Sequence, residues 1–279
     1  MDPPPPEPDR SGNYEIIRKL ADGNYSFVYE ARHISPQLRD RPITLKIMRD
    51  ARMYKRLMHS AQIAAALRHP RIPALYSVEG DSNSLYLVRK FIDGDDLQNG
   101  IRDARLTYTE VAGIVTEAGV ALDYAHACGI VHGYVHPRHL IWGNDESTWL
   151  IGFGEYPYPP DMIFGNPLHL APEQFLNNCV LTPATDTYAL CECATWLLTG
   201  CHPFGNVFGS ELLAAKQSVL SSNVELLPGK IKWRALERVL RRGLAPNPKD
   251  RYQSAFEFAA AFRSADPARE SPRRSWFWR

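Results

Sequence analysis

The chain has 279 residues and a mass of 31.6 kDa, with 44% hydrophobic and 23% charged residues, and this ordinary globular balance predicts one or two domains. Lys and Arg total 32 and Asp and Glu total 31, so the net charge of +1 gives no reason to expect a nucleic-acid or anionic-membrane partner. The five cysteines lack CxxC spacing and favour a reducing, cytoplasmic setting. The longest apolar run, residues 188–198, is too short to span a bilayer.

In chain order, the sequence predicts a strand-rich segment followed by a helical one. Residues 1–12 begin MDPPPPEPDR and predict a disordered tail, because proline lacks the N–H that helices and ladders need. Short apolar runs predict five strands, at 14–20, 27–32, 42–49, 74–79 and 84–91. Helical spacing predicts helices at 54–69, 107–129, 184–200, 210–220, 232–244 and 254–262.

These elements predict an α+β fold with two lobes, a five-stranded antiparallel N-lobe with one helix (13–91) and a mainly helical C-lobe (94–264). Residues 265–279 are expected to be a flexible tail. Its end, RRSWFWR, predicts either an anchor for a partner or a segment that packs back on the helical lobe.

Eight segments resemble, in the family's order, the motifs of the eukaryotic-type protein kinases. They are LADGNYSFVYEA (20–31), TLKI (44–47), LRHPRI (67–72), AHACGIVHGYVHPRHLI (125–141), WLIGFGE (149–155), GNPLHLAPE (165–173), TPATDTYAL (182–190) and NPKDRYQSAFEFAAAF (247–262). The resemblance covers about residues 14–263 and is greatest to bacterial Ser/Thr members. It implies the bilobal kinase fold.

The resemblance also implies which residues would transfer phosphate, and most of them are replaced. Lys46 stands where the family has its nucleotide lysine, but Ser60 stands where a helix glutamate would hold that lysine. In the catalytic loop, Tyr134 replaces the base, and neutral tyrosine, with a pKa of about 10, is a poor proton acceptor. His139 and Gly152 replace the two magnesium ligands, so no metal site is expected. His136 replaces a lysine that contacts the substrate phosphate.

The implied nucleotide site is also altered. Only Gly23 remains of three phosphate-loop glycines, with Ala21 and Ser26 at the other two positions. Arg89 aligns with the back wall of the adenine pocket, where a guanidinium would fill the space or need a buried anion. Lys46, Gly23, Val28 and Asp96 are therefore expected to be vestigial contacts, and ATP could bind only without metal.

By contrast, the residues that support the family's fold are retained. His132 and Phe153 match the lower members of its internal hydrophobic spine, and Asp186 matches the aspartate that caps the catalytic-loop backbone. Glu173 and Arg251 match a buried ion pair. This pattern predicts a pseudokinase that binds, regulates or scaffolds a protein partner, such as an active kinase or another signalling protein. The alternative is a divergent active Ser/Thr protein kinase that uses ATP.

Overall fold

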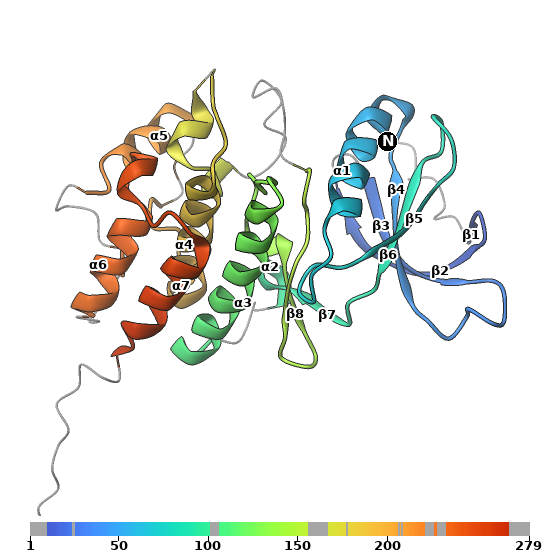
Figure 1. Ribbon diagram of the computed structural model, residues 1–279, viewed down its shortest axis with the longest axis horizontal. Coiled ribbons are helices and arrows are strands. Elements are labelled where there is room, and N and C mark those ends of the chain that lie inside the picture. Colours follow the sequence, from blue (N-terminus) through green and yellow to red (C-terminus); the bar gives the residue numbers. More distant parts are fainter. Residues whose placement is uncertain are drawn as a thin grey trace, which may run out of the picture. The chain divides into compact units, whose positions relative to one another are not determined.

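A computed structural model defines residues 10–23, 26–100, 106–155, 167–176, 178–205, 207, 209–220, 226–227 and 233–267 (Figure 1). The chain divides into two compact units. The described residues up to Gly94 form the first unit together with Ile151–Glu155, and Asp95–Leu150 and the described residues after 155 form the second. The α+β kinase-like plan, with a sheet-rich and a helical part, is confirmed. None of the described helices is long and apolar enough to cross a bilayer.

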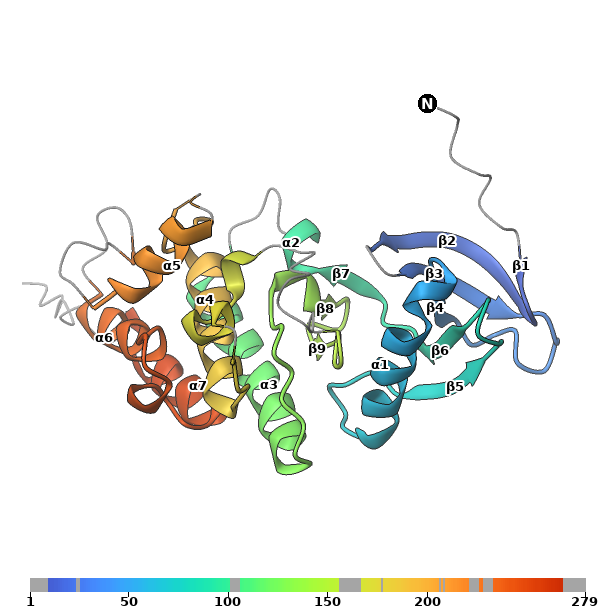
Figure 2. The ribbon, with the colours of Figure 1, turned by 90° about the horizontal axis from the view of Figure 1, so that it is seen from above.

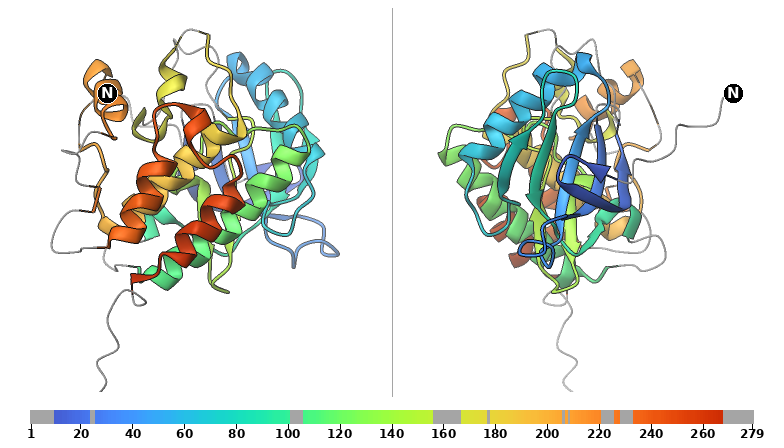
Figure 3. Two further views of the ribbon diagram at one scale, coloured as in Figure 1. Left: turned by 60° about the vertical axis from the view of Figure 1, so that its left-hand side comes forward. Right: turned by 90° about the vertical axis from the view of Figure 1, so that its right-hand side faces the viewer.

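The first unit is built on an antiparallel sheet with the strand order β1-β2-β3-β4-β6-β5 (Figure 3). Its elements are β1 (Arg10–Ser11), β2 (Tyr14–Asp22), β3 (Ser26–His33), β4 (Ile43–Met48), a 3-10 turn (Ala51–Met53), α1 (Tyr54–Ala66), β5 (Leu75–Glu79) and β6 (Tyr86–Lys90). The sheet has six strands where five were expected. The extra strand, β1, has two residues inside the predicted tail, too few to show an alternating pattern.

Both faces of this sheet are covered by apolar side chains, because alternate residues of a strand point to opposite faces. One face carries a cluster of Tyr14, Tyr29, Ala31, Ile43, Leu45, Tyr86 and Val88. The other face packs Leu57 and Ala61 of α1 against Met48, Leu85 and Leu87. The helix α1 lies beside the strands of this sheet (Figure 2). Helix α1 ends at Ala66 rather than at residue 69, because Leu67 already adopts extended backbone ahead of Pro70.

The second unit joins a small sheet to a helical core. Its strands and helices are β7 (Gly94–Asp96), α2 (Leu97–Gly100), α3 (Tyr108–Ala127), β8 (Leu140–Gly143), β9 (Thr148–Leu150), α4 (Pro183–Thr199), α5 (Gly209–Gln217), α6 (Arg234–Gly243) and α7 (Ala255–Ser264). Its 3-10 turns are Pro137–His139, Pro167–His169, Pro172–Phe175 and Pro248–Asp250. The strands β7, β8 and β9 pair in that order.

Helix α3 lies alongside α7 (Figure 3). A β-carbon on Gly119 of α3 would lie 3.0 Å from the carbonyl oxygen of Ala255 at the start of α7, so the helices approach too closely for a larger residue. Asp123 of α3 accepts hydrogen bonds from Ser254 Oγ and from the N–H groups of Ala255 and Phe256, which caps α7. Of the predicted tail at 265–279, Ala265 is buried, and residues 268–279 lie outside the described part.

Candidate functional site

Lys46, the predicted nucleotide lysine, is a buried residue of β4 with an acidic partner that the sequence did not reveal. Its strand neighbours in register are Val28 and Leu87. Its ammonium forms an ion pair with the carboxylate of Glu155, the residue that follows the GFG motif. Burial lowers the pKa of Lys46, and the negative charge of Glu155 opposes that shift. The lysine therefore has a counter-ion, although the expected helix glutamate is absent.

Ser60 of α1, at the position of that glutamate, is buried and hydrogen-bonded. Its Oγ donates to the carbonyl oxygen of Phe153 at 3.0 Å and accepts from Arg89 Nη2 at 3.2 Å. The segment Ile151–Glu155 passes very close to α1 here, because a β-carbon on Gly154 would lie 2.8 Å from the Cα of Ser60. The hydrogen bond from Ser60 to Phe153 thus ties this segment to α1, and the guanidinium of Arg89 adds a charged donor to the same hydroxyl.

In the described part of the chain, the basic side chains of Lys46, Arg56 and Arg89 surround one acid, Glu155. Arg56 Nη2 donates to the backbone oxygen of Glu155 at 2.8 Å. Arg89 donates a hydrogen bond from Nη2 to Ser60, and its buried Nε has no hydrogen-bond partner among the described residues. Besides burial, the charges of Arg89 and Arg56 also lower the pKa of Lys46, so both guanidinium groups act electrostatically on the lysine. The guanidinium that the sequence placed at the back of the adenine pocket has Glu155 as its nearby anion.

The predicted metal-ligand position carries no side chain and has a backbone that favours glycine. Gly152 has a φ of +91°, and its carbonyl oxygen accepts a hydrogen bond from the N–H of Glu155 at 3.1 Å. Phe153 beside it is buried within the first unit. An aspartate at 152 would therefore meet backbone strain in this conformation.

The phosphate-loop residues are engaged by Arg49. Its guanidinium donates to the carbonyl oxygen of Gly23, with Nε at 3.2 Å and Nη2 at 3.0 Å, and it also pairs with the Asp22 carboxylate. The same guanidinium lies 4.2 Å from the ring centre of Phe27. Gly23 and Asp22 thus already have a cation as partner. Val28, the predicted apolar contact, is half-buried in β3.

In the second unit, Asp186 of α4 anchors the catalytic-loop backbone. Its fully buried carboxylate accepts hydrogen bonds from the N–H of His132 at 2.8 Å and from the N–H of Gly133 at 2.7 Å. His126 Nε2 lies 2.8 Å from the same carboxylate. Burial alone would lower the pKa of His126, but Asp123 and Asp186 outweigh it and raise the pKa to about 9.

Aromatic rings fill the part of the loop where the family carries its base and metal ligand. The carbonyl oxygen of Tyr134 accepts from His139 Nδ1 at 2.8 Å, so the buried His139 is held by the backbone. The ring centre of His136 lies 4.0 Å from that of His139 and 4.6 Å from that of Tyr134. His132 is buried beside His139. No carboxylate occupies positions 134, 136 or 139.

Asp96, at the position of the family's ribose contact, caps a helix. Its Oδ1 accepts from the N–H groups of Gln98 and Asn99 at 3.1 and 3.0 Å, at the start of α2. Its Oδ2 accepts from the Asn99 side chain at 2.8 Å. These hydrogen bonds give Asp96 a structural role at the start of α2 that does not require a nucleotide.

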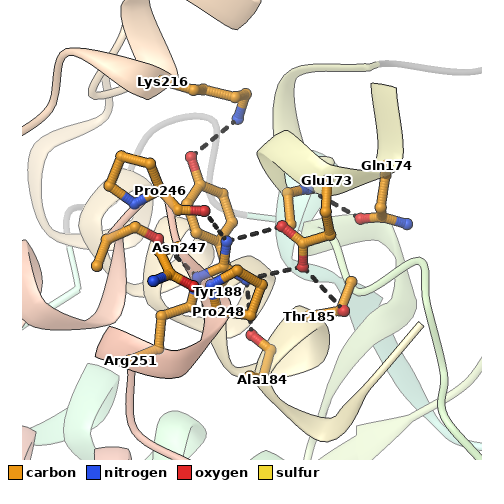
Figure 4. Close-up of polar contacts among 12 residues, drawn as sticks. Glu173, Gln174, Ala184, Thr185, Tyr188, Lys216, Pro246, Asn247, Pro248 and Arg251 are labelled. Atoms are coloured by element: carbon orange, nitrogen blue, oxygen red, sulfur yellow. Dashed lines mark hydrogen bonds and ion pairs between the residues drawn. The ribbon is translucent and has the colours of Figure 1, made fainter. Parts of the chain in front are cut away.

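The pair predicted from Glu173 and Arg251 is bidentate (Figure 4). Arg251 Nη1 and Nη2 lie 2.8 and 2.7 Å from the two Glu173 oxygens. The guanidinium also donates to the carbonyl oxygens of Ala184, Ala245 and Pro246. The buried Arg251 therefore has hydrogen-bond acceptors for its N–H groups beyond the Glu173 carboxylate. Thr185 Oγ1 adds a further bond to Glu173 at 3.0 Å.

The chain belongs to the protein kinase family, because the protein kinase domain matches residues 14–263. Among curated proteins it is similar to the serine/threonine-protein kinase PknF of Mycobacterium tuberculosis, 33% identical over 89% of this chain and 55% of PknF. It is also similar to PknH of Mycobacterium bovis (29% identical, 91% of this chain, 44% of PknH) and PknD of Mycobacterium tuberculosis (28%, 91% and 40%). The chain thus spans about half the length of these relatives or less. The predicted membership of a bacterial-like Ser/Thr kinase family is confirmed.

Two functional contacts were missed at the level of sequence. In the sequence Glu155 is only the last residue of WLIGFGE, although an acid directly after that turn is the signal that could have identified the partner of Lys46. Arg49 lies three residues after Lys46, and nothing in its spacing indicated contact with Gly23.

Proposed function

We propose that this chain is a pseudokinase that binds, regulates or scaffolds a protein partner without metal-dependent phosphotransfer. The observation that carries the proposal is Gly152, which supplies no carboxylate and has the left-handed backbone of +91° that disfavours one. His139, at the second ligand position, is an imidazole held by the Tyr134 carbonyl oxygen. Mg²⁺ requires oxygen ligands, and neither position offers one from a side chain.

We propose further that the protein requires no cofactor. Lys46 is already paired with Glu155, Gly23 and Asp22 are contacted by Arg49, and Asp96 caps α2. ATP, if it binds, would do so without metal, with the ammonium of Lys46 as the basic group for the phosphate oxygens. The expected setting is cytoplasmic and the expected partner is an active kinase or another signalling protein, with no nucleic acid involved.

A divergent active Ser/Thr kinase is the second candidate. Its support is the 33% identity to a protein named a serine/threonine-protein kinase, together with a buried Lys46 that keeps an acidic partner. In that case Glu155 is the described carboxylate best placed to take over a metal-binding role, because it follows Gly152 by three residues in the same unit.

Transfer of labelled phosphate from ATP, with Mg²⁺ or Mn²⁺, tests the two candidates. We expect no incorporation into the protein itself or into generic substrates, in wild type or in Lys46→Met. Incorporation that disappears in Lys46→Met would reject the pseudokinase. Loss of that incorporation in Glu155→Gln as well would show that the active kinase requires the acid that pairs with Lys46. Affinity capture with mass spectrometry in the native host would then identify the partner, with the tag alone as control.

A further inference from the structure

Three side chains with metal-binding atoms converge in the second unit. One ring nitrogen each of His169 and His202 and one carboxylate oxygen of Glu192 all lie within 4.8 Å of one another. His169 ends the 3-10 turn Pro167–His169, and Glu192 lies in the middle of α4. Gly200 ends that helix with a φ of +71°, and the chain then brings His202 Nδ1 to 3.6 Å from Glu192 Oε1. The tertiary structure thus gathers residues that are far apart in sequence.

Each side chain of this cluster has one buried polar atom without a hydrogen bond among the described residues. His169 is 3% exposed and Glu192 is 0% exposed, while the His202 side chain is 11% exposed. Within the described ranges, His169 Nδ1, Glu192 Oε1 and His202 Nδ1 make no hydrogen bond. Buried polar atoms in native proteins nearly always have a partner. Three such atoms in one place indicate a shared ligand, and a cation would satisfy both imidazole lone pairs and the carboxylate oxygen.

Lys216 of α5 holds the carboxylate in position. Its Nζ lies 2.9 Å from Glu192 Oε2 and 2.6 Å from the carbonyl oxygen of Leu168, the residue before His169. It therefore fixes one carboxylate oxygen, leaves Oε1 directed toward the histidines, and ties the His169 segment to α4. Metal-binding carboxylates in proteins commonly have such a hydrogen-bonded second partner.

We propose that His169, Glu192 and His202 bind a divalent transition metal ion, and that Zn²⁺ is the ion the donor set suits. Two imidazoles and a carboxylate match zinc sites that keep a fourth position open, for water or for a side chain of a partner. Tetrahedral bonds of about 2.0–2.1 Å place ligand atoms about 3.3 Å apart, so the 3.6 Å between His202 Nδ1 and Glu192 Oε1 needs little adjustment. The nitrogen ligands disfavour Mg²⁺ and Ca²⁺.

The bound ion would connect the Pro167–His169 turn and the segment after α4 to the core helix of the unit. Two features bear on its affinity. The ammonium of Lys216 already neutralises part of the Glu192 charge, which weakens attraction for a cation. The ring of His136 lies 6.2 Å from that of His169, so the histidines of the catalytic loop adjoin the cluster and must be distinguished from it.

Zinc titration of the metal-stripped full chain by isothermal calorimetry tests the proposal, with zinc X-ray absorption to count imidazole ligands. His169→Gln and His202→Gln remove one ligand each and keep a polar side chain of similar size. His59→Gln, at an exposed position of α1, is the matched control. His136→Gln tests the catalytic-loop histidines.

We expect one zinc ion per chain with two imidazoles in its first coordination sphere. Either cluster variant should weaken binding at least tenfold, and His59→Gln and His136→Gln should bind as wild type does. The absence of saturable binding, or binding that both cluster variants leave unchanged, would overturn the site. Loss of zinc binding in His136→Gln, with binding unchanged in both cluster variants, would also overturn the site. Should a cluster variant fail to fold by circular dichroism, wild-type absorption showing fewer than two imidazoles overturns the proposal independently.

Discussion

Glu155 forms an ion pair with Lys46 across 109 residues of sequence, so the buried lysine has its acid on the segment after Gly152 and not on helix α1. The α1 position that would carry a glutamate holds Ser60, which bonds to the backbone of Phe153 in that same segment. The ammonium of Lys46 is thus balanced by an acid of the same unit.

Loss of Glu155 is therefore expected to destabilise the protein. Glu155→Gln leaves the ammonium of a buried lysine without its counter-ion, and we expect the free energy of unfolding to fall by about 1–3 kcal/mol, measured by urea denaturation. Glu15→Gln breaks the exposed pair with Arg39 and should cost at most about 1 kcal/mol. The double variant Lys46→Met/Glu155→Gln should recover part of the loss. Equal effects of Glu155→Gln and Glu15→Gln would contradict this role.

Magnesium and ATP together should not stabilise the protein. A ligand at 100 times its Kd raises the stability of the folded state by about 2.7 kcal/mol, which a thermal melt detects readily. We expect no shift in Tm that depends on magnesium, because Gly152 and His139 offer no carboxylate or amide oxygen. A shift that survives chelator and disappears in Lys46→Met would indicate metal-free nucleotide binding. A shift seen only with magnesium would favour the divergent-kinase alternative.

Restoring the metal-ligand aspartate should damage the fold without restoring activity. Gly152→Asp places a β-carbon on backbone with a φ of +91°, at a cost of about 1–2 kcal/mol in the free energy of unfolding. Gly113→Asp, on an exposed part of α3 where a β-carbon meets nothing within 4 Å, is the matched control and should be nearly neutral. Tyr134→Asp alone should also give no phosphotransfer, because catalytic residues act as a unit. Activity in either repaired variant would disprove this expectation.

The His126 site predicts a dependence of stability on pH. Its pKa is about 9 in the folded protein and 6.5 as the ordinary value, so protonated His126 stabilises the fold fully below pH 6.5. That contribution, on the order of 3 kcal/mol, is lost as pH rises from 6.5 through 9. His126→Gln keeps a donor for Asp186 but does not titrate. The difference in unfolding free energy between wild type and variant should thus shrink over this range, and a constant difference would rule out the raised pKa.

The buried pair of Glu173 and Arg251 should contribute strongly to the stability of the second unit. Arg251→Met leaves Glu173 without its bidentate partner and frees three carbonyl oxygens, so we expect a loss of about 3–5 kcal/mol in urea denaturation. Adding Glu173→Leu should recover part of that loss, because the unpaired carboxylate is removed too. A double variant as unstable as the sum of both single variants would show that the ion pair itself contributes little.

The sequence alone determined the fold class and the replaced motif residues, because both can be read from local order. Apolar periodicity placed α3 at 107–129 and the structure has Tyr108–Ala127, while the order of the motifs indicated the kinase family that the comparisons show. The absence of an aspartate at 152 can be read from a single position. The sixth strand could not be predicted from the sequence, since the two residues of β1 are too few to show an alternating pattern.

The tertiary structure decided the side-chain contacts that no motif of the sequence predicted. The pairing of Lys46 with Glu155 depends on the path of Ile151–Glu155 beside α1, and that path depends on the close approach at Gly154. The convergence of His169, Glu192 and His202 depends on the turn at Gly200 and on Lys216 holding two segments together. His169 and Glu192 are 23 residues apart, and Glu192 and His202 are 10 residues apart, and neither spacing matches a metal-binding motif. The three residues meet only because the helix and turn between them pack in a way that no local sequence pattern encodes.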